Sequence, residues 1–117
     1  MKTLSSILAR TRVKNKLNHV DEENVDWIEL WKEYTGEEDP NCSNLTSCKG
    51  ISNYIVGGHV YKVDENGKAT ESGVYYVVPL CQSCNSANNK DPFFVYSSKL
   101  VKESVLLSLR NKKNNNN

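Results

Sequence analysis

The sequence predicts a small α+β domain that is held together by a bound metal ion and flanked by helices on both sides. Two pairs of cysteines frame a β-rich stretch, and apolar residues recur at helical spacing before and after it. The chain of 117 residues has room for one such domain with a thin hydrophobic core. A metal site would compensate for part of that thin core.

Charge is distributed unevenly along the chain, although the formal net charge is only +1. Residues 1–20 contain five lysines or arginines and no acidic residue, whereas residues 21–39 contain nine acidic residues and one lysine. The near-neutral total argues against a dedicated duplex-DNA-binding protein. Residues 1–20 are interpreted as a solvated basic arm, with a frayed amphipathic helix as the alternative.

No apolar run approaches the roughly 20 residues that cross a bilayer, and none resembles a signal-peptide core. The sequence therefore predicts an intracellular protein, most simply a cytoplasmic one, without membrane contacts. The basic N-terminal stretch also has the composition of a mitochondrial targeting peptide, which is the alternative location.

The domain proper is expected over residues 21–110 and opens with an acidic helix over 21–36. Asp21 is placed to cap this helix, and Gly36 is placed to end it. Large apolar side chains recur along it at helical spacing, at Trp27, Leu30, Trp31 and Tyr34. A domain of this size needs such side chains in its core, so we interpret the stripe as packing rather than as a ligand platform.

A β-hairpin is predicted next, with strands over 54–63 and 74–78. Asn66-Gly67 is a strong hairpin-turn signal, and Pro79 is expected to close the returning strand. A short helix over 85–89, a strand over 93–96 and a last helix that starts at Ser97 or Ser98 follow, within a segment that ends at residue 110. Residues 111–117 are predicted to be a disordered asparagine-rich tail.

The spacing of the four cysteines favours a metal site. Cys81 and Cys84 are separated by two residues, as in a knuckle that directs two sulfurs at one ion, and Cys42 and Cys48 lie in a turn-forming loop. Four thiolates satisfy tetrahedral Zn²⁺. In a reducing compartment this interpretation is favoured over the alternatives, which are two disulfides or a redox Cys-x2-Cys pair.

Taken together, residues 42–90 follow the order of a treble-clef zinc site, and they resemble the HNH endonuclease superfamily and its small zinc-containing relatives. The resemblance rests on Gly58-His59-Val60 and on Pro79-Leu80-Cys81-Gln82-Ser83-Cys84-Asn85. It implies a ββα-metal fold. In an active member His59 would be the general base, and Asn85 would be a ligand of the catalytic Mg²⁺ or Mn²⁺.

The HNH pattern is degenerate in this chain. Gly58 stands where such nucleases commonly have an acidic metal ligand, and Tyr76 stands near the position of their central asparagine. A nuclease needs a divalent ion to polarise the phosphoryl group, and a single Asn85 oxygen is a weak anchor for one. The missing acidic ligand of the divalent ion could instead come from a neighbouring loop, at Asp64, Glu65 or Asp91. Otherwise His59 is expected to be structural.

The leading hypothesis is a non-catalytic zinc-binding module that acts through its surface, and the alternative is a metal-dependent HNH-type endonuclease. Either a protein or a nucleic acid is expected as partner. Phosphate contacts could come from basic residues near both ends, namely Arg10, Arg12, Lys14, Lys16, Lys112 and Lys113. The acidic helix and the leucine-rich last helix offer surfaces for a protein.

Overall fold

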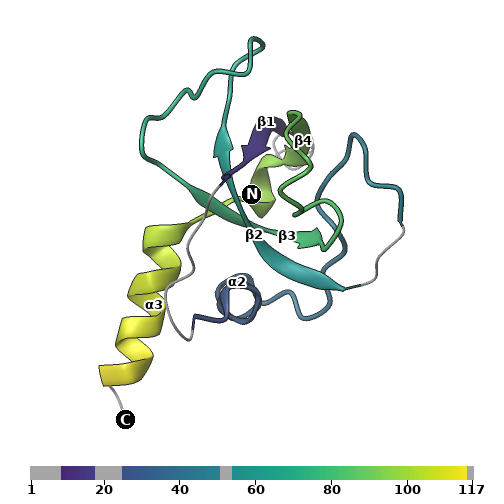
Figure 1. The fold of residues 1–117 in the computed structure, drawn as a ribbon. Coiled ribbons are helices and arrows are strands. Elements are labelled where there is room, and N and C mark those ends of the chain that lie inside the picture. The colour runs from purple at the N-terminus through teal and green to yellow at the C-terminus, as the bar shows by residue number, and fades with distance from the viewer. Residues whose placement is uncertain (1–8, 18–24, 51–53, 116–117) are drawn as a thin grey trace.

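The computed structural model describes residues 9–17, 25–50 and 54–115, and it confirms an α+β fold. A curled antiparallel sheet with the strand order β4-β1-β2-β3-β5 packs against two α-helices (Figure 1). The helices are α2 (Trp27–Thr35) and α3 (Glu103–Asn115). The strands are β1 (Arg10–Asn15), β2 (Ile55–Lys62), β3 (Tyr76–Cys81), β4 (Phe93–Tyr96) and β5 (Val101–Lys102).

The two faces of the sheet bury two separate apolar clusters, because successive side chains of a strand point to opposite sides. The first cluster is enclosed by the curl of the sheet and contains Val13, Val60, Tyr76, Val78, Leu80, Cys81, Cys84, Phe93 and Val95. The second lies beneath the helices and contains Trp27, Leu30, Trp31, Val77, Val101 and Leu106. The cysteines therefore belong to the enclosed face, and the helices cover the other one.

Helix α2 has the predicted apolar stripe and ends at the predicted residue, but it begins later than predicted. Its N-cap is Asp26, whose carboxylate accepts a hydrogen bond from the Glu29 backbone N–H, and Asp21 lies outside the described residues. Gly36 ends the helix at φ 78°, a left-handed conformation that favours glycine. Tyr34, expected in the core, is 55% exposed.

Residues 10–15 form a strand rather than the solvated arm or helix that their charge suggests. Strand β1 pairs with β2 through Val13↔Lys62 and with β4 through Arg12↔Phe94, so it lies inside the sheet. Its buried residues, Val13 and Asn15, alternate with arginine and lysine. The remainder of the predicted arm, residues 1–8 and 18–20, lies outside the described residues.

The predicted hairpin forms from β2 and β3, with a longer connection than expected. Asn66-Gly67 makes a local turn in which the Gly67 N–H donates to the Asp64 carbonyl over 2.9 Å, but this turn closes only a Val63↔Ala69 bridge. Pro79 does not end the returning strand; it lies within β3 opposite Gly57.

The C-terminal third departs from the prediction in two places. Residues 82–88 form turns instead of the helix expected over 85–89, and α3 begins at Glu103, after a 3₁₀ turn at Ser97–Lys99 and strand β5. Helix α3 continues to Asn115, into the segment expected to be disordered. The predicted strand over 93–96 is confirmed as β4. None of the described helices is long and apolar enough to span a membrane.

Candidate metal centre

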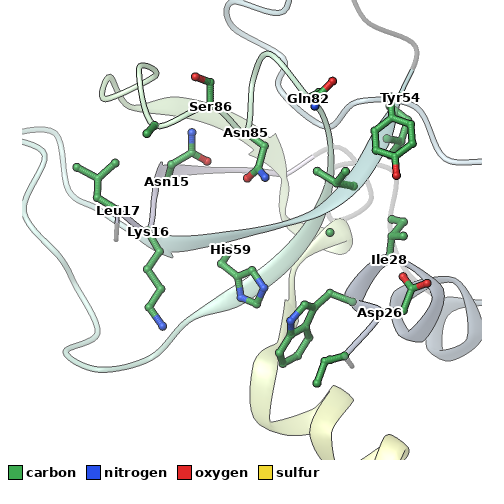
Figure 2. Close-up of a pocket in the computed structure, with 16 residues that line it drawn as sticks. Asn15, Lys16, Leu17, Asp26, Ile28, Tyr54, His59, Gln82, Asn85 and Ser86 are labelled. Carbon is green, nitrogen blue, oxygen red and sulfur yellow. The ribbon is translucent and has the colours of Figure 1, made fainter. Parts of the chain in front are cut away.

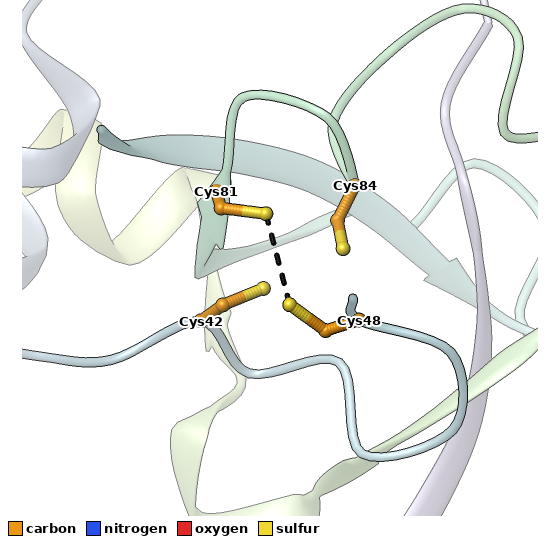
Figure 3. Close-up of side chains that lie close together, drawn as sticks. All are labelled: Cys42, Cys48, Cys81 and Cys84. Carbon is orange, nitrogen blue, oxygen red and sulfur yellow. Dashed lines mark hydrogen bonds between the residues drawn. The ribbon is translucent and has the colours of Figure 1, made fainter. Parts of the chain in front are cut away.

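The structure brings all four cysteines to one place, at the end of the β2–β3 hairpin (Figure 3). Cys81 is the last residue of β3, and Cys84 follows in the adjoining turn. Cys42 and Cys48 come from the loop that follows α2. The four sulfur atoms lie within 4.8 Å of one another, so this group could hold a metal ion.

The spacing of the sulfurs fits a metal site better than disulfides. The Cys48 and Cys81 Sγ atoms are 3.8 Å apart, and all four cysteines are free thiols. A disulfide would bring two sulfurs to about 2.05 Å. Four thiolates at about 2.3 Å from a tetrahedral Zn²⁺ are about 3.8 Å from each other, which follows from the bond length and the tetrahedral angle.

Asn44 organises the loop that carries Cys42 and Cys48. Its side-chain carbonyl accepts hydrogen bonds from the backbone N–H groups of Thr46 and Ser47, at 2.9 and 3.0 Å. Its amide donates to the Cys84 sulfur at 3.5 Å. One buried side chain thus folds the first cysteine loop and also contacts a thiol of the second pair, which is how residues around metal ligands commonly orient them.

Two further contacts fix the cysteine pairs to the sheet. The Ser43 N–H donates to the Pro79 carbonyl over 2.8 Å, which attaches the first loop to β3. The Asn15 side chain donates to the carbonyls of Cys84 and Asn89, at 2.8 and 3.2 Å, which attaches the turn after Cys81 to β1. The cluster is therefore anchored to two strands of the sheet, β3 and β1.

The surroundings of the cysteines give their thiols different pKa values. Burial raises the pKa of Cys84, and burial likewise raises that of Cys42. Burial acts in the same direction on Cys81, but hydrogen bonds from the Ser83 hydroxyl and from the backbone and thiol of Cys84 outweigh it and lower the pKa of Cys81 to about 6. The lowered pKa favours the thiolate form of Cys81, which is the form that binds metals.

His59 lies on the other face of the sheet, beneath α2. Its Nδ1 is hydrogen-bonded to the carboxylate of Glu103, in the first turn of α3. The ring meets Trp27 edge to face, with the ring centroids 4.6 Å apart and an interplanar angle of 89°. His59 is 6% exposed, and its Nε2 atom is shielded from solvent. The imidazole thus connects β2, α2 and α3.

His59 and Asn85 both line a cleft of about 760 Å³ between the start of α2 and the turn after Cys81 (Figure 2). Asp26 is the single acidic residue among the described residues that line it. Asp64, Glu65 and Asp91, considered above as substitute ligands, do not line it.

Gly58 leaves no room for the acidic ligand that the HNH pattern has at this position. A Cβ atom there would lie 2.4 Å from a methyl carbon of Leu80 and 2.9 Å from the Asn85 side-chain oxygen. Such separations are shorter than van der Waals contact, so a larger residue would require the core to move.

Three residues that contribute to these sites were not singled out from the sequence: Asn15, Asn44 and Glu103. Asn44 carried a usable signal, because an asparagine followed by small polar residues favours a side-chain-stabilised turn. Asn15 and Glu103 act through contacts with residues far away in the chain, and no local pattern marks them.

Comparisons with protein-family models, with curated proteins and with solved structures give no match. The HNH-like resemblance therefore stays a prediction.

Proposed function

We propose that this chain is a small zinc-binding module whose Zn²⁺ ion is held by Cys42, Cys48, Cys81 and Cys84. The observation that carries the proposal is the convergence of four free thiols, all within 4.8 Å of one another, from two distant chain segments. Thiolate sulfur is a preferred ligand of Zn²⁺, and four of them complete its tetrahedral coordination.

The role of the ion is structural in this proposal. A site with four protein ligands has no open position for water or substrate, which a catalytic zinc site retains. Cys81 and Cys84 belong to the enclosed apolar cluster, and Cys42 and Cys48 pack against it. The ion would join the loop after α2 to the hairpin and so add a cross-link to a domain with a thin core.

The zinc core is also proposed to be a shortened treble clef of HNH-like form. A loop cysteine pair, the β2–β3 hairpin and a second pair follow one another in the treble-clef order. The turns at 82–88 take the place of the helix that completes such a site elsewhere. The shortened form removes one of the elements that an HNH nuclease needs.

His59 is proposed to be structural, so that the module acts by binding rather than by catalysis. A general base must present a nitrogen to the water that it activates. In His59 one ring nitrogen is bonded to Glu103, and the other is shielded from solvent beside Trp27. The endonuclease alternative would require this ring to leave its present contacts.

Cobalt substitution tests the proposed zinc site. Co²⁺ in a tetrahedral tetrathiolate site gives intense visible absorption bands and a sulfur-to-metal charge-transfer band. We expect both bands in the Co²⁺-loaded protein, their disappearance on addition of Zn²⁺, and a weakened, altered spectrum in Cys48→Ser. The matched control is Ser108→Ala, at an exposed position of α3 away from the cysteines, which should leave the spectrum unchanged. An octahedral Co²⁺ spectrum in the wild type would refute the four-thiolate site.

A further inference from the structure

Strand β1 presents its basic side chains on the side opposite to the enclosed core. Val13 and Asn15 are buried, so the alternation of the strand places Arg10, Arg12 and Lys14 together on the other side. Their partners across the ladder share that side. These are Tyr96 opposite Arg10, Phe94 opposite Arg12 and Tyr61 opposite Lys14. We call these six residues the basic–aromatic face.

Cations and rings are in direct contact on this face. The Arg12 guanidinium lies 4.9 Å from the centroid of the Phe94 ring, and the Arg10 guanidinium lies 5.5 Å from that of Tyr96. The Tyr61 ring meets Tyr75 edge to face, with centroids 6.2 Å apart, and Lys16 lies over Tyr75 at 4.0 Å. The three rings of the face and the neighbouring ring of Tyr75 are all half-buried, so part of each remains open to solvent.

The helices cover a different part of the same side of the sheet. Trp27 of α2 packs against Gly57 of β2 so closely that a Cβ on the glycine would lie 2.7 Å from the Trp27 Cβ. Val77 of β3 and Val101 of β5 belong to the cluster beneath the helices. Helices α2 and α3 thus pack on β2, β3 and β5, and the basic–aromatic face occupies β4, β1 and the end of β2.

No acidic side chain of the surrounding strands neutralises the positive charge of the basic–aromatic face. Strands β1, β2, β3 and β4 contain no acidic residue. The acidic side chains near α2 pair with lysines outside the face, in the ion pairs Glu29–Lys32, Glu33–Lys113 and Glu37–Lys99. Among the described residues, these acidic side chains of α2 and the turn after it are therefore paired away from the basic strand β1.

We propose that the basic–aromatic face binds single-stranded RNA, an inference that rests on the proposed role of the chain as a binding module. The cations can neutralise phosphates, and half-exposed rings in contact with guanidinium groups are surfaces on which unpaired bases stack. Paired bases are already stacked on each other, so a duplex could not use these rings. The phenolic hydroxyls of Tyr61 and Tyr96 can hydrogen-bond a ribose 2′-OH, which favours RNA over DNA.

Fluorescence anisotropy of the zinc-loaded full chain with a labelled oligouridylate of about 12 nucleotides tests this proposal. If three phosphates are neutralised, the affinity should fall about 20-fold between about 50 and 200 mM salt. Arg10→Gln with Arg12→Gln should lower the salt slope by about 1.4. Phe94→Leu keeps the site apolar but removes the ring, and should weaken binding by about 5- to 150-fold.

The matched control is Lys112→Gln with Lys113→Gln, which removes the same charge at the end of α3 and should leave the affinity within about twofold. Equal losses in the two double variants would overturn the assignment to this face. Equal affinity for a DNA oligomer, or for a duplex, would overturn the assignment to single-stranded RNA. Failure to bind any oligonucleotide with one zinc per chain intact would overturn the RNA proposal and leave the metal proposal standing. Zinc content and the melting temperature confirm that each variant is folded.

Discussion

Thr46, in the loop between the first two cysteines, accepts a hydrogen bond from the backbone N–H of Phe94 over 2.9 Å. The adjacent Leu45 donates its own N–H to the Phe94 carbonyl, also over 2.9 Å. The cysteine loop therefore pairs with the outer edge of β4, the last strand of the sheet on that side. A metal ion that orders this loop would also hold the strand that carries Phe94 and Tyr96.

Removal of the metal should therefore weaken RNA binding without any change at the RNA-binding residues. A chelator should lower the oligouridylate affinity by at least about tenfold, and added Zn²⁺ should restore it, because loss of the ion releases the edge partner of β4. Anisotropy titrations with and without chelator measure this effect. Equal RNA affinities of the metal-free and the zinc-loaded protein would show that the cysteine loop does not support the basic–aromatic face.

The contact between Thr46 and Phe94 should make a small, separable contribution to stability. Thr46→Val removes the hydroxyl and keeps the shape of the side chain, so we expect a loss of about 0.5–1.5 kcal/mol in the free energy of unfolding. Urea denaturation measures it, and Thr46→Ser, which keeps the hydroxyl, should lose less. Zinc content should remain at one per chain in both variants, because Thr46 is not a ligand.

Asn44 should matter for metal affinity although it is not a ligand. Asn44→Ala removes the hydrogen bond to the Cys84 sulfur and the two bonds that fold the loop. Loss of such a supporting residue typically lowers metal affinity about 10- to 100-fold. Competition with a chromogenic chelator measures the affinity. Asn41→Ala, at an exposed position of the same segment, is the control and should bind zinc like the wild type.

His59 should be needed for stability and not for phosphodiester hydrolysis. His59→Ala removes the contacts to Trp27 and Glu103, and the expected loss is about 1–3 kcal/mol in the free energy of unfolding. Supercoiled plasmid incubated with the wild type and Mg²⁺ or Mn²⁺ should stay intact. Nicking by the wild type that His59→Ala abolishes would instead establish the endonuclease alternative.

Tyr76 should make stability depend on pH in the alkaline range. Burial, and next its hydrogen bond to Glu71, raise the pKa of Tyr76 above the ordinary value of 10.0. The folded state thus retains a proton that the unfolded chain releases, so this contribution is complete below pH 10 and is lost as the pH rises through the folded pKa. Thermal melts should show a steeper loss above pH 10 in the wild type than in Tyr76→Phe. Parallel pH profiles would contradict the prediction.

The sequence correctly predicted the elements whose structure depends mainly on residues close to one another in the chain. The α2 stripe of Trp27, Leu30 and Trp31 and the stop at Gly36 follow from helical spacing and glycine conformation, and both are present. The convergence of the cysteines was predictable because their spacing has few uses other than metal binding in a reducing compartment.

Elements that depend on distant partners were missed. Strand β1 has only one apolar residue, Val13, and its stability comes from β2 and β4, which lie far away in the chain. Its basic residues were therefore interpreted as an arm. The start of α3 was misplaced for a similar reason, because β5 pairs with β3 and delays the helix to Glu103.

Native mass spectrometry of the protein, purified under reducing conditions without added metal, shows whether the four cysteines hold a metal ion. We expect one Zn²⁺ per chain, released together with unfolding when the thiols are modified. A folded protein of metal-free mass, or one lighter by the four hydrogens that two disulfides remove, would contradict it.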